Sequence, residues 1–597
     1  MSPRADGQVR RGQVITTYGP GALIDLPQDS AIVAGLDSWP KRSELEEIVE
    51  PRLTNWLRTL TGIDNPRLYA PPPDSNDPRE QLRSIGAYRF PEWFLVQETR
   101  DSEERERSRR LVHRKALTKG RFEGLKVVAT RFVRACPRGH VDDIDWRRFV
   151  HREAEDRCNR QLWLDERGTS GDLADLVVRC ECKKSRGLHE ASVIEMNPLG
   201  TCRGARPWLG KGANEACDQP SRLLTRTASN AYFPQVVSVL SLPDRGSEAE
   251  SVVRELWDDM QIVENAQVLG IMKRKPAVME QLAPFSDEEV LDAIQSIKSG
   301  GLGDRPVKHV ELDAILAAPE GFGDDVPVDH NFHARRLPEH TWRRSERFSG
   351  IETVIQLHRL REILALIGFT RFEAITPDID GEYDTDVEAA DIAREPQWFP
   401  AVENRGEGIF LQISASAVKG WLARPEVAHR LDGLEGGYRL WAENRRIQQP
   451  FPGGPYILLH TLSHLLIQSL AMRCGYPATS IRERIYRDDP AERYGILLYT
   501  GSPDADGTLG GLVQQARYIE DHLLLALRMG ELCSNDPICA HHEPGSSMEK
   551  RWLHGAACHG CALVAETSCE MRNDYLDRAL VVPALGVPGA SFFRVPT

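Results

Sequence analysis

Long apolar runs are absent from this sequence of 597 residues. No segment approaches the roughly 18 consecutive apolar residues that a membrane-spanning helix needs, and the opening MSPRADGQVRR lacks the apolar core of a secretory signal. We therefore expect a cytoplasmic protein with no membrane association. With 41% hydrophobic and 27% charged residues, the chain can bury several cores. We expect roughly three to five domains for this length.

Signatures of common nucleotide-binding and hydrolytic enzymes are also lacking. The stretch TYGPGALIDL (17–26) is rich in glycine, but no Gly-Lys-Ser/Thr follows to supply the lysine and hydroxyl of a phosphate loop. Its proline also removes one backbone donor. Neither a nucleophile elbow nor a helicase phosphate loop occurs elsewhere in the sequence. The sequence therefore names no catalytic residue, and we expect a noncatalytic protein.

An excess of positive charge is missing as well, since the formal net charge at pH 7 is -13. This argues against a protein that coats nucleic acid over its whole surface. One segment is locally basic, because ten Arg/Lys face five Asp/Glu between Arg100 and Lys126. Two interpretations stay open, a solvated mixed-charge helix and a surface that follows a phosphate backbone. For the second, the expected DNA contacts are Arg109, Arg110, Arg114 and Lys115.

Cysteine is scarce and unevenly placed. The chain has 12 cysteines, all of them between residues 136 and 217 or between 474 and 569. In a reducing cytoplasm, clustered thiols indicate metal ligands before disulfides. Zinc takes four ligands in a tetrahedron, and these usually come in close pairs on turns. We therefore expect two cysteine-rich zinc-binding modules, one in each group.

In the first group, the spacing favours one particular zinc site. Cys180 and Cys182 form a close pair at the end of a predicted strand. Cys202 and Cys217 could supply the other two ligands across a short excursion of the chain. These four residues form the preferred zinc site of this group.

A second pair of ligands lies earlier in the same group. Cys136 and His140 stand four residues apart in CPRGH, and Cys158 could join them. Spacing alone does not settle how the seven candidates divide, or whether they form one site or two.

The second group lies in ELCSNDPICA and LHGAACHGCALVAETSCE. Cys558 and Cys561 have the spacing at which two thiolates on a tight turn bind one metal, and Cys569 follows on what we expect to be the first turn of a helix. The fourth ligand must then come from Cys533 or Cys539. Four thiolates leave no position for an activated water, so this site should be structural. A redox role for Cys-His-Gly-Cys is disfavoured. A redox pair functions with two cysteines, so it would not explain the three further cysteines nearby.

Two histidines share one predicted helix. His460 and His464 are spaced i, i+4 in PYILLHTLSHLLIQSLAMRCGYP (455–477) and would lie on one helix face. No glutamate follows His460 as in the zincin pattern, and leucines flank both histidines. This favours a buried, hydrogen-bonded structural role. The alternative is a metal-dependent nuclease or hydrolase that uses both histidines and a nearby aspartate such as Asp504.

Periodicity and turn signals predict a multidomain α+β fold with a mixed strand/helix core. The β-branched runs of the first thirty residues predict strands, and Ser286 with Glu289 has capping-box spacing. IETVIQLHRLREILALIGF (351–369) has the apolar spacing of a helix. The expected parts are a strand-rich region with the basic segment (1–126), the first zinc-binding module (127–242), a helical region (243–375), a linker or insertion (376–408) and a C-terminal zinc-binding domain (409–597).

Several segments in combination carry a family resemblance. They are VRRGQVITTYGPGALIDLP, CPRGH, SNAYFPQVVSVLSLP, LREILALIGFTRF, the block from HTLSHLLIQ to GYPATSIRERIY, YTGSPDADGTLGGL, and DPICA with GAACHGCALVAETSCEMRNDYLDRALV. Together they resemble the DrmB family of the DISARM anti-phage defence system, over nearly the full chain. The final part, 409–597, is similar to a cysteine-bearing domain that ends certain superfamily-two helicases.

The resemblance implies partners as well as a cofactor. DrmB-like proteins work with the large helicase DrmA, in which ATP hydrolysis resides, and the pair engages DNA alongside a methyltransferase. The zinc-binding domain of the related helicases aligns with Cys558, Cys561 and Cys569, although the remaining cysteines lie farther upstream here than in those helicases. We therefore expect a noncatalytic Zn²⁺-binding subunit of a DISARM complex, a heterodimer with DrmA that helps engage phage DNA.

Overall fold

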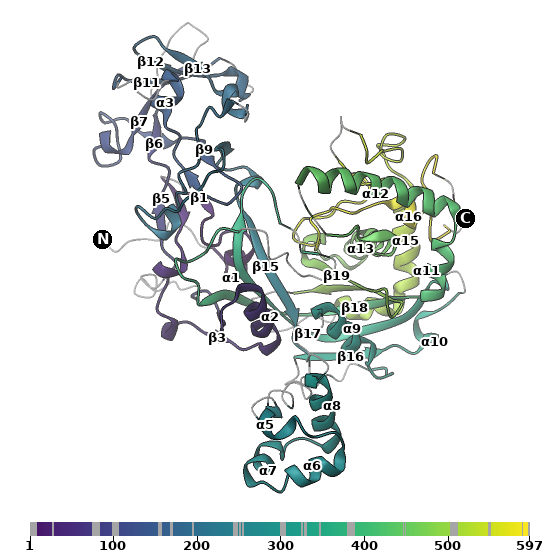
Figure 1. Ribbon diagram of the computed structural model, residues 1–597. Coiled ribbons are helices and arrows are strands. Elements are labelled where there is room, and N and C mark those ends of the chain that lie inside the picture. Colours follow the sequence, from purple (N-terminus) through teal and green to yellow (C-terminus); the bar gives the residue numbers. More distant parts are fainter. Residues whose placement is uncertain are drawn as a thin grey trace.

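Two long antiparallel strands, β17 (Ile351–Thr370) and β18 (Trp398–Ile413), run through the middle of the molecule (Figure 1). Their register extends from Ile351 opposite Ile413 to Ala365 opposite Ala401. The protein was studied as a computed structural model. It describes residues 9–26, 29–73, 84–97, 107–152, 158–167, 171–193, 196–242, 249, 252–253, 256–298, 306–323, 326, 331–345, 348–375, 377–378, 389–445, 447, 449–501, 511–546, 551–587 and 589–594.

The helix predicted for residues 351–369 is wrong, because this run is strand β17. The strand is buried along most of its length, so its apolar residues form a nearly continuous run instead of alternating. Such a run cannot be told from a helix by periodicity, whereas its isoleucines, valine and threonines favour a strand. The linker predicted for residues 376–408 is likewise wrong from Trp398 onward, where β18 begins.

The two strands form the centre of an eight-stranded sheet. Its main path is β15-β17-β18-β20-β19, with β16 added to β17, and β4 joining β18 to β3. All pairs are antiparallel except that of β4 with β18. The further strands are β3 (Glu47–Ile48), β4 (Arg67–Tyr69), β15 (Phe233–Leu240), β16 (Phe332–Arg336), β19 (Ile481–Asp488) and β20 (Arg493–Thr500).

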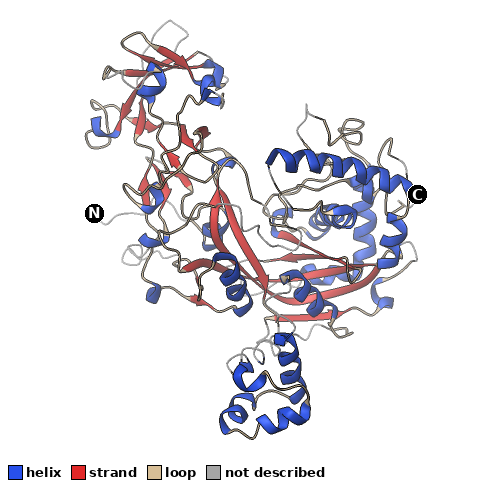
Figure 2. Ribbon diagram, viewed as in Figure 1, coloured by secondary structure: helices blue, strands red, loops and turns tan. Residues whose placement is uncertain are grey.

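Helices gather around the C-terminal part of this sheet (Figure 2). The predicted apolar helix is α13 (Gly453–Cys474), which packs against β19, β20, α15 (Ile519–Glu531) and α16 (Arg578–Val581). It is apolar on all sides, and a helix of that kind is stable only inside a core. The others near it are α9 (Val307–Leu316), α10 (Glu339–Trp342), α11 (Ala415–Leu422), α12 (Pro425–Arg445) and α14 (Gly511–Gln514).

The N-terminal half is built mainly of short strands (Figure 2). Three strands pair as β1-β2-β5, three as β10-β9-β14, and six as β13-β12-β11-β7-β6-β8. Their bounds are β1 (Leu23–Asp25), β2 (Ser30–Val33), β5 (Ala87–Arg89), β6 (Trp93–Val96), β7 (Arg107–His113), β8 (Val127–Ala129), β9 (Phe132–Ala135), β10 (Val141–Asp142), β11 (Leu162–Glu166), β12 (Leu176–Cys180), β13 (Ser185–Gly187) and β14 (Arg222–Thr225).

Three helices accompany these strands, α1 (Arg11–Thr16), α2 (Pro51–Thr61) and α3 (Trp146–His151). The β-branched residues before Tyr18, for which a strand was expected, lie in or beside α1. In the basic segment, the described part is strand β7 and a 3-10 turn at Arg114–Ala116, so a solvated helix is excluded there.

A separate helical unit projects from the sheet (Figure 1). It consists of α5 (Trp257–Met260), α6 (Ala266–Met272), α7 (Pro276–Leu282) and α8 (Asp287–Lys298), which enclose a small apolar core of their own. The predicted capping box of α8 is confirmed. The Ser286 amide donates to Glu289 over 2.7 Å, and the Glu289 amide donates to the Ser286 hydroxyl over 3.2 Å.

The fold class predicted from the sequence, multidomain α+β with a mixed strand/helix core and cysteine-rich clusters that could hold zinc, is confirmed. Among the described residues, no helix combines the length and apolar character needed to cross a membrane.

Arg371 follows β17 and ties three N-terminal segments to it. Its guanidinium donates to the carbonyls of Gly139 (2.8 Å), Gly21 (2.7 Å) and Ala231, and it is fully buried. Burial lowers the pKa of Arg371 to about 10, which still leaves it charged at pH 7. Because Gly139 lies in the turn between Cys136 and His140, the arginine also fixes a loop that bears candidate metal ligands.

Arg371→Lys should therefore destabilise the fold although it keeps the charge. A lysine ammonium cannot reach three carbonyls as the planar fork does, and two lost charged hydrogen bonds cost about 3 kcal/mol. Urea unfolding followed by tryptophan fluorescence measures this loss. Arg439→Lys on the exposed surface of α12 is the control, and an equal midpoint for both variants would contradict the role of Arg371.

Candidate metal centres

Within the described residues, four groups of His, Cys and Glu side chains converge closely enough to share a metal ion. In each group the four potential ligand atoms all lie within 4.8 Å of one another. Every cysteine of the chain except Cys474 belongs to one of them. We call them centre I (Cys136, His140, Cys202, Cys217), centre II (His151, Cys158, Cys180, Cys182), centre III (Cys533, Cys539, Cys558, Cys561) and centre IV (His460, His464, Glu483, Cys569).

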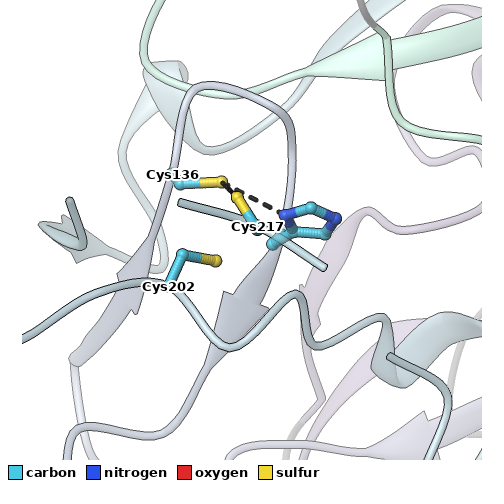
Figure 3. A group of neighbouring side chains, drawn as sticks. Cys136, Cys202 and Cys217 are labelled. Atoms are coloured by element: carbon cyan, nitrogen blue, oxygen red, sulfur yellow. Dashed lines mark hydrogen bonds between the residues drawn. The ribbon is translucent and has the colours of Figure 1, made fainter. Parts of the chain in front are cut away.

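Centre I lies at the hairpin between β9 and β10. Figure 3 shows the sulfur atoms of Cys136, Cys202 and Cys217 directed toward one another. Cys136 Sγ lies 3.3 Å from His140 Nδ1 and 4.0 Å from Cys217 Sγ. His140 Nε2 lies 2.6 Å from Glu215, so Nε2 carries the proton and donates it in a hydrogen bond to the carboxylate. Nδ1 then keeps its lone pair for the centre, which is the arrangement usual for histidine ligands of metals.

The thiols of centre I do not share one protonation state. A hydrogen bond from Cys136 lowers the pKa of Cys202 to about 4, and the same contact raises the pKa of Cys136. The Gly204 amide also donates to Cys202 Sγ over 3.3 Å. Of the three thiols, that of Cys202 is therefore the one whose surroundings most favour ionisation. Since zinc binds thiolates, a metal ion would favour ionisation of the others.

Centre II lies at one end of the six-stranded sheet. Cys180 ends β12, Cys182 follows in the turn, and Cys158 Sγ lies 3.6 Å from Cys180 Sγ. His151, the last residue of α3, points Nε2 at Cys182 Sγ over 3.3 Å. Its Nδ1 donates to the Arg147 carbonyl over 2.7 Å. This bond fixes the tautomer in which Nε2 carries the lone pair that a metal ligand needs.

The structure groups these ligands differently from the expectation based on spacing. Cys180 and Cys182 belong to centre II, whereas Cys202 and Cys217 belong to centre I. The reason is topological, since Cys180 lies in the β13-β12-β11-β7-β6-β8 sheet and Cys136 in the loop of the β10-β9-β14 sheet. His151 was missed by sequence reasoning. A sequence feature that could have indicated His151 as a ligand is its position at the end of the segment WRRFVH, seven residues before Cys158.

Centre III contains four cysteines in irregular turns between α15 and α16. The sulfur atoms of Cys533 and Cys558 lie 3.4 Å apart, and those of Cys539 and Cys561 lie 3.8 Å apart. Hydrogen bonding from Cys561 lowers the pKa of Cys539 to about 5. Cys533 and Cys539 therefore both join the pair Cys558-x2-Cys561, whereas the sequence analysis expected only one of them as a ligand.

Backbone amides support the sulfur atoms of centre III. Asn535 N donates to Cys533 Sγ, and Gly560 N donates to Cys558 Sγ, each over 3.4 Å. Such amides stabilise a sulfur that carries negative charge. Four thiols with this support fit a tetrahedral zinc ion.

Cys569 does not belong to centre III, contrary to expectation. It lies with the two histidines of α13 in centre IV. The helix expected to begin there is also wrong, because α16 starts only at Arg578. Positive φ angles at Arg572, Asn573 and Tyr575 interrupt any helix between these points.

Centre IV is buried. His460 Nε2 lies 3.0 Å from Glu483 Oε1 and 3.1 Å from Cys569 Sγ, while His464 Nε2 lies 3.2 Å from the same carboxylate oxygen. The histidines are thus buried and hydrogen-bonded, as their leucine-rich surroundings indicated. Glu483 on β19 was missed, and IRERIY offered no pattern that would have revealed it. Asp504, the aspartate of the hydrolase alternative, lies outside the described residues.

The predicted DNA contacts lie on β7 and the turn that follows it. Arg109 pairs with Glu166 and Arg110 with Glu123, both over 2.7 Å. Arg114 donates to the Pro91 carbonyl over 3.2 Å, whereas Lys115 is exposed. The three arginines therefore have partners within the protein, and the lysine faces solvent.

Comparison with known families supports centre III. Residues 462–562 match the MrfA Zn-binding domain, and this range contains all four ligands of centre III. Residues 10–233 match a domain of unknown function (DUF8724), which contains centres I and II. Fold and centres together define a multidomain protein with a zinc-binding domain of the MrfA type.

A full-length relative narrows this class. Over 481 residues the chain is 32% identical to the DISARM protein DrmB of Bacillus paralicheniformis, which covers 79% of this chain and 83% of that protein. The chain belongs to the DrmB family. The resemblance inferred from its sequence segments is confirmed.

Separate centres I and II predict additive metal loss. Cys180→Ser and Cys202→Ser should each remove one zinc ion, and the double variant two, because the two residues lie in different centres. Plasma mass spectrometry of the purified full-length protein measures zinc per chain. Cys474→Ser, outside all four centres, is the control and should remove none. A double variant that loses no more zinc than either single variant would show one shared site.

Proposed function

We propose that this chain is a noncatalytic, zinc-stabilised subunit of a DISARM anti-phage complex, where it binds the helicase DrmA and helps engage phage DNA. The observation that carries the proposal is the identity with a DISARM protein DrmB over most of both chains. The four-cysteine centre within the matched zinc-binding domain supports the structural part of it.

Zinc would be held by centres I, II and III, whose donors are sulfur and imidazole nitrogen, the ligands that zinc prefers. Bound there, zinc supplies a tetrahedral cross-link between chain segments. Four protein ligands leave no position for an activated water, so these centres favour a structural role over a catalytic one. The free cysteines also suit a reducing cytoplasm, where thiolates persist as metal ligands.

Centre III illustrates why the fold needs such a cross-link. Between the end of α15 and Arg578, the described chain forms turns and isolated bridges without a regular helix or strand. Such a segment gains little from secondary-structure hydrogen bonds, so metal binding would provide much of its folding free energy.

The proposed DNA-facing surface is the turn region 114–126 with the end of β7. Its lysines Lys115, Lys119 and Lys126 are exposed and can reach phosphate oxygens. Arg109, Arg110 and Arg114 hold neighbouring segments through hydrogen bonds to Glu166, Glu123 and the Pro91 carbonyl. In this proposal the lysines carry most of the DNA contact and the arginines hold the surface in shape.

The alternative is a hydrolase that uses His460 and His464. Of the three residues expected for that hydrolase, the two histidines meet in centre IV, next to the carboxylate of Glu483. However, Cys569 is a fourth donor in that centre, and all four residues are buried. A hydrolytic metal needs an open position for water, so we favour the noncatalytic function.

Lys115→Glu, Lys119→Glu and Lys126→Glu together should weaken DNA binding by the complex with the helicase. Each lost phosphate contact lowers the slope of log affinity against log salt by about 0.9 on duplex DNA, so three lower it by roughly 2 to 3. Fluorescence anisotropy with a labelled DNA at several salt concentrations measures this slope.

A triple variant with the same change in net charge serves as control. Lys275→Glu, Lys419→Glu and Arg439→Glu replace exposed residues just before α7, on α11 and on α12. Equal slopes for the wild type and both variants would remove the proposed DNA surface but leave the zinc-binding proposal intact.

A further inference from the structure

Centre IV brings together four potential ligands from three parts of the C-terminal domain. His460 and His464 come from consecutive turns of α13, Glu483 from β19, and Cys569 from the loop before α16. The two imidazole rings meet edge to face at 4.6 Å. The exposed fractions are 0% for both histidines, 3% for Glu483 and 7% for Cys569.

The hydrogen bonds of His464 leave a lone pair facing an anion. Its Nδ1 donates to the Ala562 carbonyl over 2.8 Å. In the neutral imidazole, Nε2 is then an acceptor, and it lies 3.2 Å from Glu483 Oε1. Two acceptors at this distance repel each other in a buried site. A cation between them converts the contact into shared coordination, and Nδ1 bonded to a carbonyl is the usual support of a histidine ligand.

Besides the two histidines, uncharged donors hold the Glu483 carboxylate in place. The Ser463 hydroxyl donates to Oε2, and the Glu570 amide donates to Oε1 over 3.3 Å. The nearby ammonium of Lys308 pairs instead with Glu570, over 2.9 Å. A fully buried carboxylate costs several kcal/mol unless a cation compensates it.

Two backbone amides donate to the sulfur of Cys569. Its sulfur accepts the amides of Asn573 over 3.1 Å and Met571 over 3.4 Å. The same kind of amide bond supports Cys533 and Cys558 in centre III. With a divalent cation in this centre, the Cys569 thiolate and the Glu483 carboxylate would together balance its charge.

We propose that His460, His464, Glu483 and Cys569 bind a zinc ion, so that the C-terminal domain holds a second structural metal besides that of centre III. Two imidazoles, one carboxylate and one thiolate form a four-ligand shell of the types zinc prefers, with a net charge of zero. His460 and Cys569 lie outside the matched zinc-binding range, and that match does not assign the site.

The position of this metal gives it a distinct structural task. Glu483 belongs to the sheet, α13 is the central helix of the C-terminal core, and Cys569 lies in the loop that follows centre III. The ion would fasten that loop to both layers. Centre III cross-links the loop segments to one another, whereas centre IV anchors them to the rest of the fold.

Zinc content of full-length variants tests the proposal. Cys569→Ser and Glu483→Gln should each lower the zinc content by one ion per chain relative to wild type. Cys558→Ser should remove a different ion, so Cys558→Ser with Cys569→Ser should remove two. Cys474→Ser, at the end of the same helix α13, is the matched control and should remove none. Unchanged zinc content in soluble Cys569→Ser and Glu483→Gln overturns the proposal.

A second measurement covers variants that fail to fold. Wild-type protein produced with zinc should contain four ions per chain, one for each centre, and three or fewer would overturn the proposal. In soluble protein reconstituted with Co²⁺, Cys569→Ser should reduce the thiolate-to-cobalt absorption in the near ultraviolet. A spectrum identical to that of wild type would contradict a Cys569 ligand.

Discussion

The pairing of β17 with β18 is the interaction on which the rest of this structure depends. The end of this strand pair near Ile363 and Val402 lies in the N-terminal core, and the other end, near Val354 and Leu411, lies in the C-terminal core. Each strand is therefore part of two cores, and neither core is complete without it. Arg371, which follows β17, also holds the hairpin that carries centre I. A change in the register of the two strands would therefore displace both cores.

The sequence predicted features that depend on neighbouring residues and missed those that depend on distant ones. The helix around His460, the capping box at Ser286 and the pair Cys558-x2-Cys561 are local patterns, and the structure contains each of them. The strand at 351–370 resembled a helix because burial removed its alternation. The division between centres I and II, and the place of Cys569, depend on which sheet and loop each cysteine joins. Spacing contains no information about that choice.

Centres I to III occur where the chain forms short elements and turns. Centre I closes a hairpin loop, centre II joins a helix end to a strand end, and centre III lies among turns. Each gathers four ligands, which favours cross-linking over chemistry. In the function that we propose, this suits a subunit that presents rigid surfaces to partners. The basic turn beyond β7 is the surface that we assign to DNA.

The central claim is that metal ions in these centres hold the folded chain together. Native mass spectrometry of the full-length protein, combined with its melting temperature before and after treatment with a zinc chelator, tests this claim most directly. We predict a mass that exceeds that of the polypeptide by four zinc ions, one per centre, and a marked fall in melting temperature when they are removed. A metal-free mass, or a melting temperature that does not change on chelation, would contradict the account.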